Sequence, residues 1–98
     1  MLECIVADDE KLARDVLENY ISRMDDLRLV AMCRNAFEVD SFLQQSTADI
    51  LFLDIEMPER TGVDLIRTMK DRPRIVLTTA YKDHAVEAFD LHVIDYLL

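Results

Sequence analysis

Long apolar runs are missing from this chain. The longest uninterrupted one, Leu29 to Cys33, is far shorter than the roughly 20 residues that a membrane-spanning helix requires. The amino terminus, MLECIVADDE, also lacks the basic start and the long apolar stretch of a secretory signal peptide. The sequence therefore predicts a protein without membrane contact, and we expect it in the cytoplasm.

Chain breakers, cysteines and positive charges are also scarce. There is one glycine and there are two prolines among 98 residues, with no linker, low-complexity tract or repeat, so we expect a single domain over residues 1–98. The two cysteines, Cys4 and Cys33, lie in apolar stretches, which predicts buried reduced thiols rather than a disulfide. The net charge of −9 argues against binding of nucleic acid or an anionic membrane by this segment itself.

Short apolar runs alternate with helical periodicities along the whole chain. Runs of apolar and β-branched residues predict buried strands at Leu2 to Ala7, Leu27 to Cys33, Ile50 to Leu53, Arg74 to Thr78 and Val93 to Leu98. Apolar residues at helical spacing predict helices from Lys11 to Met24, after Asn35, after Thr61 and from Lys82 to Leu91. Asn35, with Glu38 three residues later, and Thr61 are typical N-caps. This alternation predicts a parallel sheet with helices on both faces.

Polar side chains follow several of these strands at the point where each strand ends. Asp8 and Asp9 follow the first strand, Asp54 follows the third, and Thr78 and Thr79 end the fourth. Ligands of open parallel sheets bind beyond the carboxyl ends of the strands, so we expect these residues to gather at one edge. A plainer interpretation is open for each acid: the first two as caps of the first helix, and the third as a turn residue.

Three carboxylates at one sheet edge require a proton or a cation. If Asp8 or Asp9 lies about 5 Å from Asp54, each pair of charges costs roughly 3 kcal/mol at an effective dielectric constant near 20. Oxygen ligands without a neighbouring histidine or cysteine suit a hard divalent ion, and a small number of protein ligands favours Mg²⁺ over Ca²⁺. The sequence therefore predicts a Mg²⁺ site to which a phosphate group can bind.

Three motifs together carry a family resemblance. DDE after the first strand, DIEMPERTG after the third and TTA after the fourth resemble the receiver domain of two-component response regulators, over the whole chain. The resemblance implies a flavodoxin-like α/β fold whose five strands have the order 2-1-3-4-5. The final stretch, AYKDHAVEAFDLHVIDYLL, is most similar to receivers that precede a LytTR-type DNA-binding domain. The resemblance to receiver domains also implies that the chain is a signalling phosphoacceptor rather than an enzyme.

The resemblance implies a role for each acidic residue. Asp54 would accept a phosphoryl group from the phosphohistidine of a sensor histidine kinase. Asp9 and Asp54 would bind Mg²⁺ directly, with the backbone carbonyl of Glu56 as a third protein ligand. Asp8 would act on the metal through water.

The same resemblance implies a switch. Thr79 would hydrogen-bond the attached phosphoryl group, and Ala80 would leave space beside it. Tyr96 would be the aromatic residue that fills the space vacated by Thr79, although an ordinary strand tyrosine is the alternative at that position.

The chain departs from the family pattern at its end. Receivers carry a lysine directly after the last strand and then a fifth helix, and Leu98 precedes both. We therefore expect four helices, and a chain that is part of a longer protein and binds DNA only through a C-terminal effector domain. The sheet face left uncovered predicts a homodimer or a substitute helix. The alternative function is a receiver fold that no longer switches and serves as an interaction or dimerisation module, with a hydrolase as a more distant third.

Overall fold

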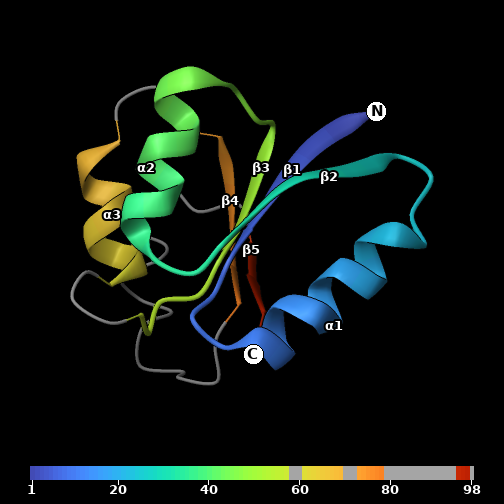
Figure 1. The fold of residues 1–98 in the computed structure, drawn as a ribbon, viewed down its shortest axis with the longest axis horizontal. Helices are drawn as coiled ribbons and strands as arrows, with labels where there is room; N and C mark the ends of the chain where they lie inside the picture. The colour runs from blue at the N-terminus through green and yellow to red at the C-terminus, as the bar shows by residue number, and fades with distance from the viewer. Residues whose placement is uncertain (58–60, 70–72, 79–94, 98) are drawn as a thin grey trace.

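Five parallel strands form one sheet in the order β2-β1-β3-β4-β5 (Figure 1). The computed structural model describes residues 1–57, 61–69, 73–78 and 95–97 of the chain. The strands are β1 (Leu2–Ala7), β2 (Leu27–Cys33), β3 (Ile50–Leu53), β4 (Arg74–Thr78) and β5 (Asp95–Leu97). The helices are α1 (Lys11–Ser22), α2 (Ala36–Gln45) and α3 (Gly62–Thr68). This arrangement confirms the predicted parallel sheet and its strand order, while the helix predicted at 82–91 lies outside the described residues.

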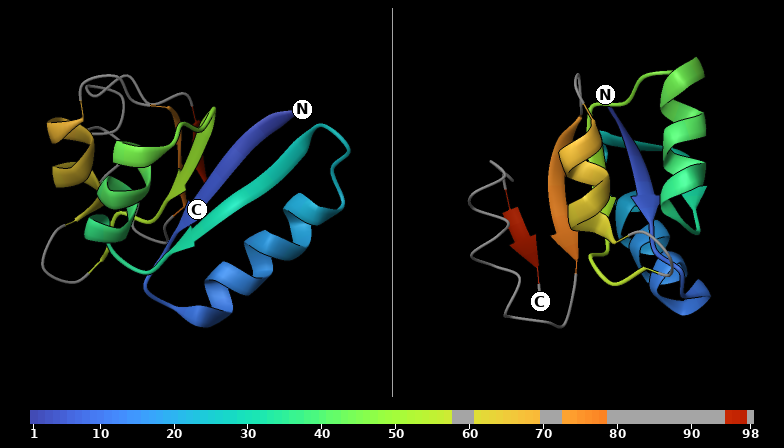
Figure 2. Two further views of the ribbon diagram at one scale, coloured as in Figure 1. Left: turned by 45° about the horizontal axis from the view of Figure 1, so that its top comes forward. Right: turned by 90° about the vertical axis from the view of Figure 1, so that its left-hand side faces the viewer.

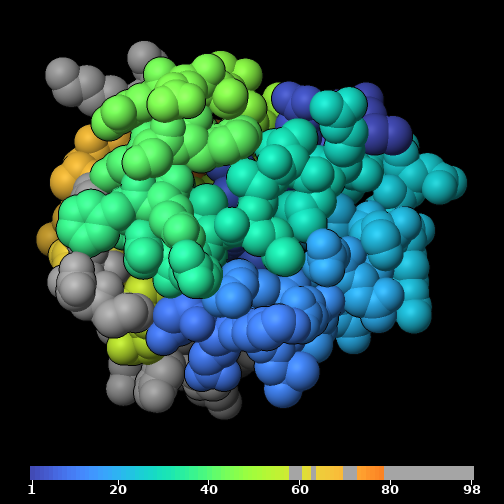
Figure 3. All heavy atoms as spheres, in the orientation of Figure 1, coloured from blue at the N-terminus to red at the C-terminus, as the bar shows by residue number. Residues whose placement is uncertain are grey.

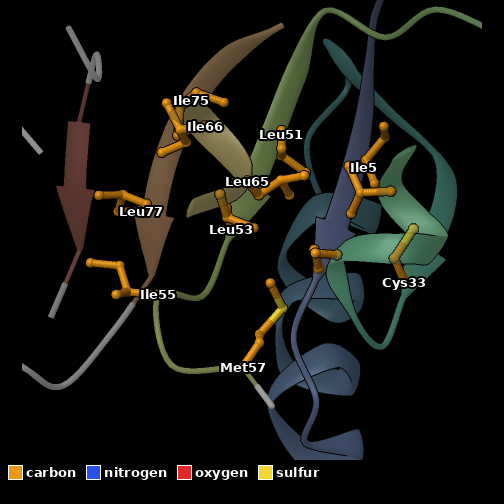
Figure 4. Close-up of a cluster of buried hydrophobic side chains, with 13 residues drawn as sticks. Ile5, Cys33, Leu51, Leu53, Ile55, Met57, Leu65, Ile66, Ile75 and Leu77 are labelled. Carbon is orange, nitrogen blue, oxygen red and sulfur yellow. The ribbon is translucent and has the colours of Figure 1, made fainter. Parts of the chain in front are cut away.

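The sheet lies between two helical layers. α2 and α3 cover one face and α1 covers the other (Figures 1 and 2). Figure 4 shows the first layer, where Ile5, Leu51 and Ile75 of adjacent strands belong to one buried cluster with Leu65 and Ile66 of α3.

β1 is buried on both faces, which explains its apolar sequence from Cys4 to Ala7 without alternation. On β3, Leu51 and Leu53 are buried, whereas Ile50 and Phe52 on the α1 side are only partly buried, so the burial predicted for this strand holds for one face. Each fully buried Leu or Ile of this core contributes roughly 1.5–3 kcal/mol.

α1 is covered less completely than its apolar periodicity suggests. The helix ends at Ser22, two residues before the last apolar position of the predicted segment, because Arg23 leaves the regular helix as its C-cap. Only Ile21 is buried within it, whereas Leu12, Val16 and Tyr20 are 75%, 45% and 56% exposed. The periodicity therefore predicted the helix correctly but not how much of its apolar surface would be covered.

Side-chain caps begin the other two helices where the sequence placed them. Asn35 Oδ1 accepts a 2.9 Å hydrogen bond from the backbone N–H of Glu38, whose carboxylate accepts one from the N–H of Arg34 at 2.6 Å. Thr61 and Asp64 form a reciprocal capping box at the start of α3. In the part of the chain that the structure describes, no helix is long and apolar enough to cross a bilayer.

Both cysteines are buried and carry no disulfide, as predicted. Burial raises the pKa of the Cys33 thiol to about 11, with the charge of Glu38 acting in the same direction. Burial also raises the pKa of Cys4. Thiols that stay protonated at neutral pH are poor nucleophiles, so these residues serve as small core side chains.

β2 forms one edge of the sheet and is irregular there. Cys4 of β1 pairs with Leu29 and Ile5 pairs with Ala31, so Val30 has no partner in the β1–β2 register. This extra residue is a β-bulge, which bends the strand and increases its local twist.

Candidate functional site

The carboxyl ends of β1 and β3 place two acidic residues side by side. Ala7 pairs with Leu53 in register, so Asp8 and Asp54 leave the sheet next to each other. The N–H of Asp54 donates a 2.9 Å hydrogen bond to the Ala7 carbonyl and continues the pairing beyond the strand ends. The strand order reverses between β1 and β3, because β2 lies on the far side of β1 and β4 lies on the far side of β3. Ligands of such sheets bind at this reversal.

Three carboxylates gather at this edge. One oxygen of each of Asp8, Asp9 and Asp54 lies within 4.8 Å of the other two. Asp8 is buried, Asp54 is partly buried and Asp9 is exposed. The turn that leads into α1 and the loop after β3 lie beside each other in both the ribbon and the space-filling views (Figures 1 and 3). The structure thus brings together the three acids that the sequence led us to expect at one edge.

The environment of Asp54 disfavours its charge. Burial raises the pKa of its carboxyl group to about 7 from 3.8, and the negative charges of Asp8, Asp9 and Glu56 act in the same direction. A 3.2 Å hydrogen bond from the Glu56 N–H to Asp54 Oδ1 opposes this rise without cancelling it. Without a cation, the cluster therefore keeps a proton on Asp54 for much of the neutral pH range.

Asp8 is held by its main chain and its side chain together. Its N–H donates to the Cys33 carbonyl at 3.0 Å, and its Oδ1 accepts from the Glu10 N–H at 3.0 Å. Burial raises the pKa of this carboxyl, with Asp9 and Glu10 as neighbouring charges. Glu10 is the N-cap residue of α1 and makes no side-chain capping bond. Asp8 assists the start of the helix because it accepts the hydrogen bond from the Glu10 N–H. The capping interpretation accounts for Asp8 Oδ1. It does not explain why a carboxylate oxygen of Asp8 lies within 4.8 Å of one of Asp54.

The loop after Asp54 is anchored from below by apolar side chains. Ile55 is fully buried and Met57 is 6% exposed, and both belong to the buried cluster that includes Leu65 and Ile66 of α3 (Figure 4). Glu56 between them is exposed, so its side chain lies on the outer side of the loop. The loop backbone at Glu56 is therefore fixed next to the acidic cluster by its two neighbours.

Gly62, the first residue of α3, closes on the same loop. Its N–H donates to the Ile55 carbonyl at 2.8 Å. A Cβ atom at this position would lie 2.6 Å from the Asp54 carbonyl oxygen and 3.0 Å from the Ile55 Cα. The first distance is shorter than real Cβ atoms show, and the second is tighter than most, so α3 reaches the loop this closely because this residue lacks a side chain.

The remaining predicted residues are described in part or not at all. Thr79 and Ala80 lie outside the described residues, and Tyr96 is described only as a backbone position of β5. Thr78 ends β4 directly opposite the point where Asp54 leaves β3. Its hydroxyl oxygen is buried and has no hydrogen-bond partner in the described part of the structure.

Two residues beside the cluster were missed by the sequence interpretation. Arg14 Nη1 donates a 2.9 Å hydrogen bond to the Asp8 carbonyl, a contact that no motif signals. Gly62, the one glycine of the chain, was given no role, although glycine is the residue that permits close approach of one backbone segment to another.

The donor set suits a hard divalent cation. The cluster found in the described residues consists of carboxylates alone, which are the ligands that Mg²⁺ prefers. The raised pKa values of Asp8 and Asp54 point the same way, because a cation would replace the proton that the metal-free cluster retains. The residues present therefore fit a Mg²⁺ ion.

Comparison with known proteins gives consistent matches. Residues 4–98 match the family model described as the response regulator receiver domain. The chain is 38% identical over 100 residues to the transcriptional regulatory protein BtsR of Salmonella typhi, and 36% identical over 101 residues to the sensory transduction protein LytT of Bacillus cereus. All of this chain is covered in both cases, but only 42% and 41% of those relatives. The chain thus spans less than half the length of these curated relatives.

Solved structures agree with the sequence matches. The response regulatory domain of mrkE from Klebsiella pneumoniae superposes with a TM-score of 0.91 at 37% identity, over 99% of this chain and 82% of that one. TrrA of Thermotoga maritima, solved in complex with Mg²⁺-BeF, superposes with a TM-score of 0.85 at 25% identity, over 100% of this chain and 86% of that one. The similarity extends over both helical layers and the sheet edge that carries the acids.

Proposed function

The chain belongs to the response regulator receiver domain family, and we propose that it works as a phosphoacceptor switch with Asp54 as the acceptor. Receiver domains of response regulators are signalling modules rather than enzymes. The observation that carries the proposal is the acidic cluster. Asp54 emerges at the carboxyl end of a central strand, with one oxygen within 4.8 Å of oxygens from two further aspartates.

The reaction transfers a phosphoryl group between two protein side chains. A carboxylate oxygen of Asp54 attacks the phosphorus of a phosphohistidine on a sensor histidine kinase. The new P–O bond forms as the P–N bond breaks, and the histidine nitrogen keeps the electron pair and takes up a proton. Because the carboxylate is the nucleophile, Asp54 must first lose the proton that its raised pKa favours.

A Mg²⁺ ion would neutralise part of the negative charge of the cluster and of the incoming phosphoryl group. Asp9, Asp54 and the backbone carbonyl of Glu56 are the direct ligands in this proposal, and Asp8 acts through water. Buried Ile55 and Met57 support this ligand set, since they fix the loop on both sides of Glu56. Asp8, held at its N–H and at Oδ1, supplies a fixed carboxylate behind the exposed Asp9.

The switch itself involves residues that the structure does not describe in full. We propose that Thr79 hydrogen-bonds the phosphoryl oxygens, that Ala80 leaves room for them and that Tyr96 follows Thr79 inward. The position of Thr78, opposite Asp54 at the end of β4, supports this, because Thr79 is the next residue in the sequence. The equilibrium between two existing arrangements would then shift with phosphorylation.

The output lies beyond this domain. We propose that the receiver controls a C-terminal DNA-binding domain of the LytTR type, and that phosphorylation favours a homodimer. The relatives BtsR and LytT, more than twice as long as this chain, support an additional domain. The net charge of −9 supports DNA contact through such a domain rather than through the receiver.

Phosphorylation by a small donor tests the proposal directly. With acetyl phosphate and Mg²⁺, the chain is expected to gain the mass of one phosphoryl group, and Asp54→Asn is expected to gain none. Intact mass spectrometry measures both. Asp25→Asn is the matched control, because it removes an exposed carboxylate that follows α1 and does not belong to the acidic cluster. This variant should gain mass as the wild type does.

Two results would reject the switch. If neither the 98-residue chain nor a chain extended past Leu98 gains mass, Asp54 is not a phosphoacceptor, and a pure interaction module becomes the better interpretation. Steady release of phosphate over many turnovers would instead indicate a hydrolase.

An exposed apolar row on α1 supports docking of the kinase beside the acceptor. Leu12, Val16 and Tyr20 follow one another at i, i+4 and i+8, and Met24, 52% exposed, continues the row just past the helix. Side chains at this spacing lie on one helix face, and the row begins one turn from the acidic cluster. Surface rows of large apolar side chains mark interaction sites.

Val16→Glu is expected to slow phosphotransfer from the kinase by about tenfold or more, because a charge in a buried interface is costly. Phosphorylation by acetyl phosphate should be unchanged, since Val16 lies outside the acidic cluster. Rapid-quench assays with an autophosphorylated histidine kinase that serves the wild type measure the first rate. Glu18→Gln, also exposed on α1 but outside the row, is the control. Equal slowing of both donors would contradict docking.

A further inference from the structure

Arg14 connects the first turn of α1 to the turn that carries Asp8 and Asp9. Its backbone N–H donates to the Glu10 carbonyl at 3.1 Å, which fixes the residue in the helix. Its Nη1 reaches back and donates to the Asp8 carbonyl at 2.9 Å. Arg14 is partly buried, so this charged hydrogen bond is only partly screened by water.

The contact completes the set of bonds that hold Asp8. The Asp8 N–H is bound to β2 through the Cys33 carbonyl, and Oδ1 is bound to the start of α1 through the Glu10 N–H. The carbonyl is bound by Arg14. Two of these three partners are backbone groups that any sequence supplies, so Arg14 is the contribution that depends on a particular side chain.

The charge of Arg14 acts on more than the turn. It is one of the charges that lower the pKa of Glu38 on α2, after the larger effects of hydrogen bonds from Arg34. The guanidinium group therefore lies close enough to α2 for its charge to act on Glu38.

We propose that Arg14 is a positioning residue for the cation site: by holding the Asp8 carbonyl, it keeps the carboxylates of Asp8 and Asp9 turned toward Asp54. This inference rests on the proposed Mg²⁺ site. Arg14 does not touch the metal or the phosphoryl group and acts only through the ligands.

The two possible effects of removing Arg14 have opposite signs. Loss of a positive charge near the cluster, taken alone, strengthens the attraction for Mg²⁺. Loss of the hydrogen bond frees the turn and weakens binding, by about tenfold for typical supporting partners of metal ligands. Removal of Arg14 makes the net charge more negative, so weaker Mg²⁺ binding by that variant would identify the loss of positioning rather than the loss of charge.

The test is a calorimetric titration of the 98-residue chain with MgCl₂, at a temperature where circular dichroism shows every variant to be folded. Arg14→Met is expected to weaken Mg²⁺ binding about tenfold. Arg14→Lys keeps the charge but reaches the Asp8 carbonyl with a different geometry, so its Mg²⁺ affinity should fall less than that of Arg14→Met. Arg23→Met, exposed at the other end of α1, removes the same charge and should bind at least as tightly as the wild type.

The outcomes separate this inference from the proposed function. If the wild type binds Mg²⁺ and the affinity of Arg14→Met is within about twofold of the wild-type affinity, the positioning role is overturned. A supporting partner of a metal ligand changes the affinity by about tenfold or more. An equal loss in Arg23→Met overturns it as well, because the effect would then follow charge rather than contact. If the wild type itself does not bind Mg²⁺, the proposed metal site is wrong.

Discussion

Asp54→Asn is expected to stabilise the metal-free chain near neutral pH, although it removes the central residue of the proposed site. Burial raises the pKa of Asp54 to about 7, and three neighbouring carboxylates add to the shift. Above that pH, the folded protein must hold a partly buried charge beside other negative charges. Asparagine has nearly the same shape and no charge, so the folded state no longer carries this cost.

The pH dependence follows from the direction of the shift. At low pH the carboxyl group is protonated in both the folded and the unfolded chain. Between the ordinary value of 3.8 and about 7, only the folded chain keeps the proton, so the free energy of unfolding falls as the pH rises. Above the folded pKa, the loss is complete. Asp8, whose pKa burial also raises, contributes with the same sign and leaves some pH dependence in the variant.

The magnitude can be bounded. One pH unit in this window changes the free energy of unfolding by at most about 1.4 kcal/mol, and partial exposure of Asp54 reduces the sum, so we expect on the order of 2 kcal/mol. In a domain of this size, that corresponds to about 10 °C in melting temperature. Thermal unfolding in EDTA at several pH values measures it for the wild type and Asp54→Asn.

Asp25→Asn provides the control, because it removes an exposed carboxylate outside the cluster and should leave the pH profile unchanged. Addition of Mg²⁺ near neutral pH should then stabilise the wild type more than Asp54→Asn, as expected for a cation that binds the folded state. A variant less stable than the wild type near pH 8, roughly one unit above the folded pKa, would contradict the electrostatic account.

Substitution of Gly62 is expected to damage both the fold and the site. A Cβ atom there would lie 2.6 Å from the Asp54 carbonyl oxygen, and a backbone atom of a paired strand end has little freedom to give way. Alanine gains up to about 1 kcal/mol in helix propensity, but overpacking costs about 1–3 kcal/mol. We expect a net loss of about 1–2 kcal/mol for Gly62→Ala and a larger loss for Gly62→Val.

The effect on the site is separable from the loss of stability. α3 and the Asp54 loop must move apart, which displaces the acceptor relative to Asp8 and Asp9. A displacement of about 1 Å is enough to slow a positioned reaction by about a hundredfold. Urea unfolding in EDTA measures stability, and the rate of mass gain with acetyl phosphate under folding conditions measures the site. Arg67→Ala, exposed in the last turn of α3, should change neither. A Gly62→Ala variant that is phosphorylated at the wild-type rate would show that the loop adapts.

Buried strands and their acidic ends were predictable from the sequence alone. Four of the five predicted strands have the bounds that the structure shows, because each apolar run ends abruptly at polar residues. Their burial was less predictable, since the edge strand β2 has one buried residue, Cys33. The predicted last strand is longer than β5 (Asp95–Leu97) as the structure describes it. The register of Ala7 with Leu53 then determined that Asp8 and Asp54 would meet.

Contacts that depend on three-dimensional approach were not predictable. The periodicity of α1 is the same for Ile21, which is buried, and for Leu12, which is 75% exposed, because periodicity does not record how wide a face the neighbours cover. The bond from Arg14 to the Asp8 carbonyl depends on the angle at which α1 leaves the turn. No local pattern encodes that angle.

The irregular edge at β2 has a consequence for behaviour at high concentration. An edge strand offers unpaired N–H and C=O groups to which another strand can add, and regular edges therefore favour aggregation. Val30 interrupts the spacing of these groups in β2, and the bulge twists the strand away from a flat template. A second copy of the chain that approached this edge would find no continuous ladder to extend, so the edge guards the protein against open-ended sheet growth.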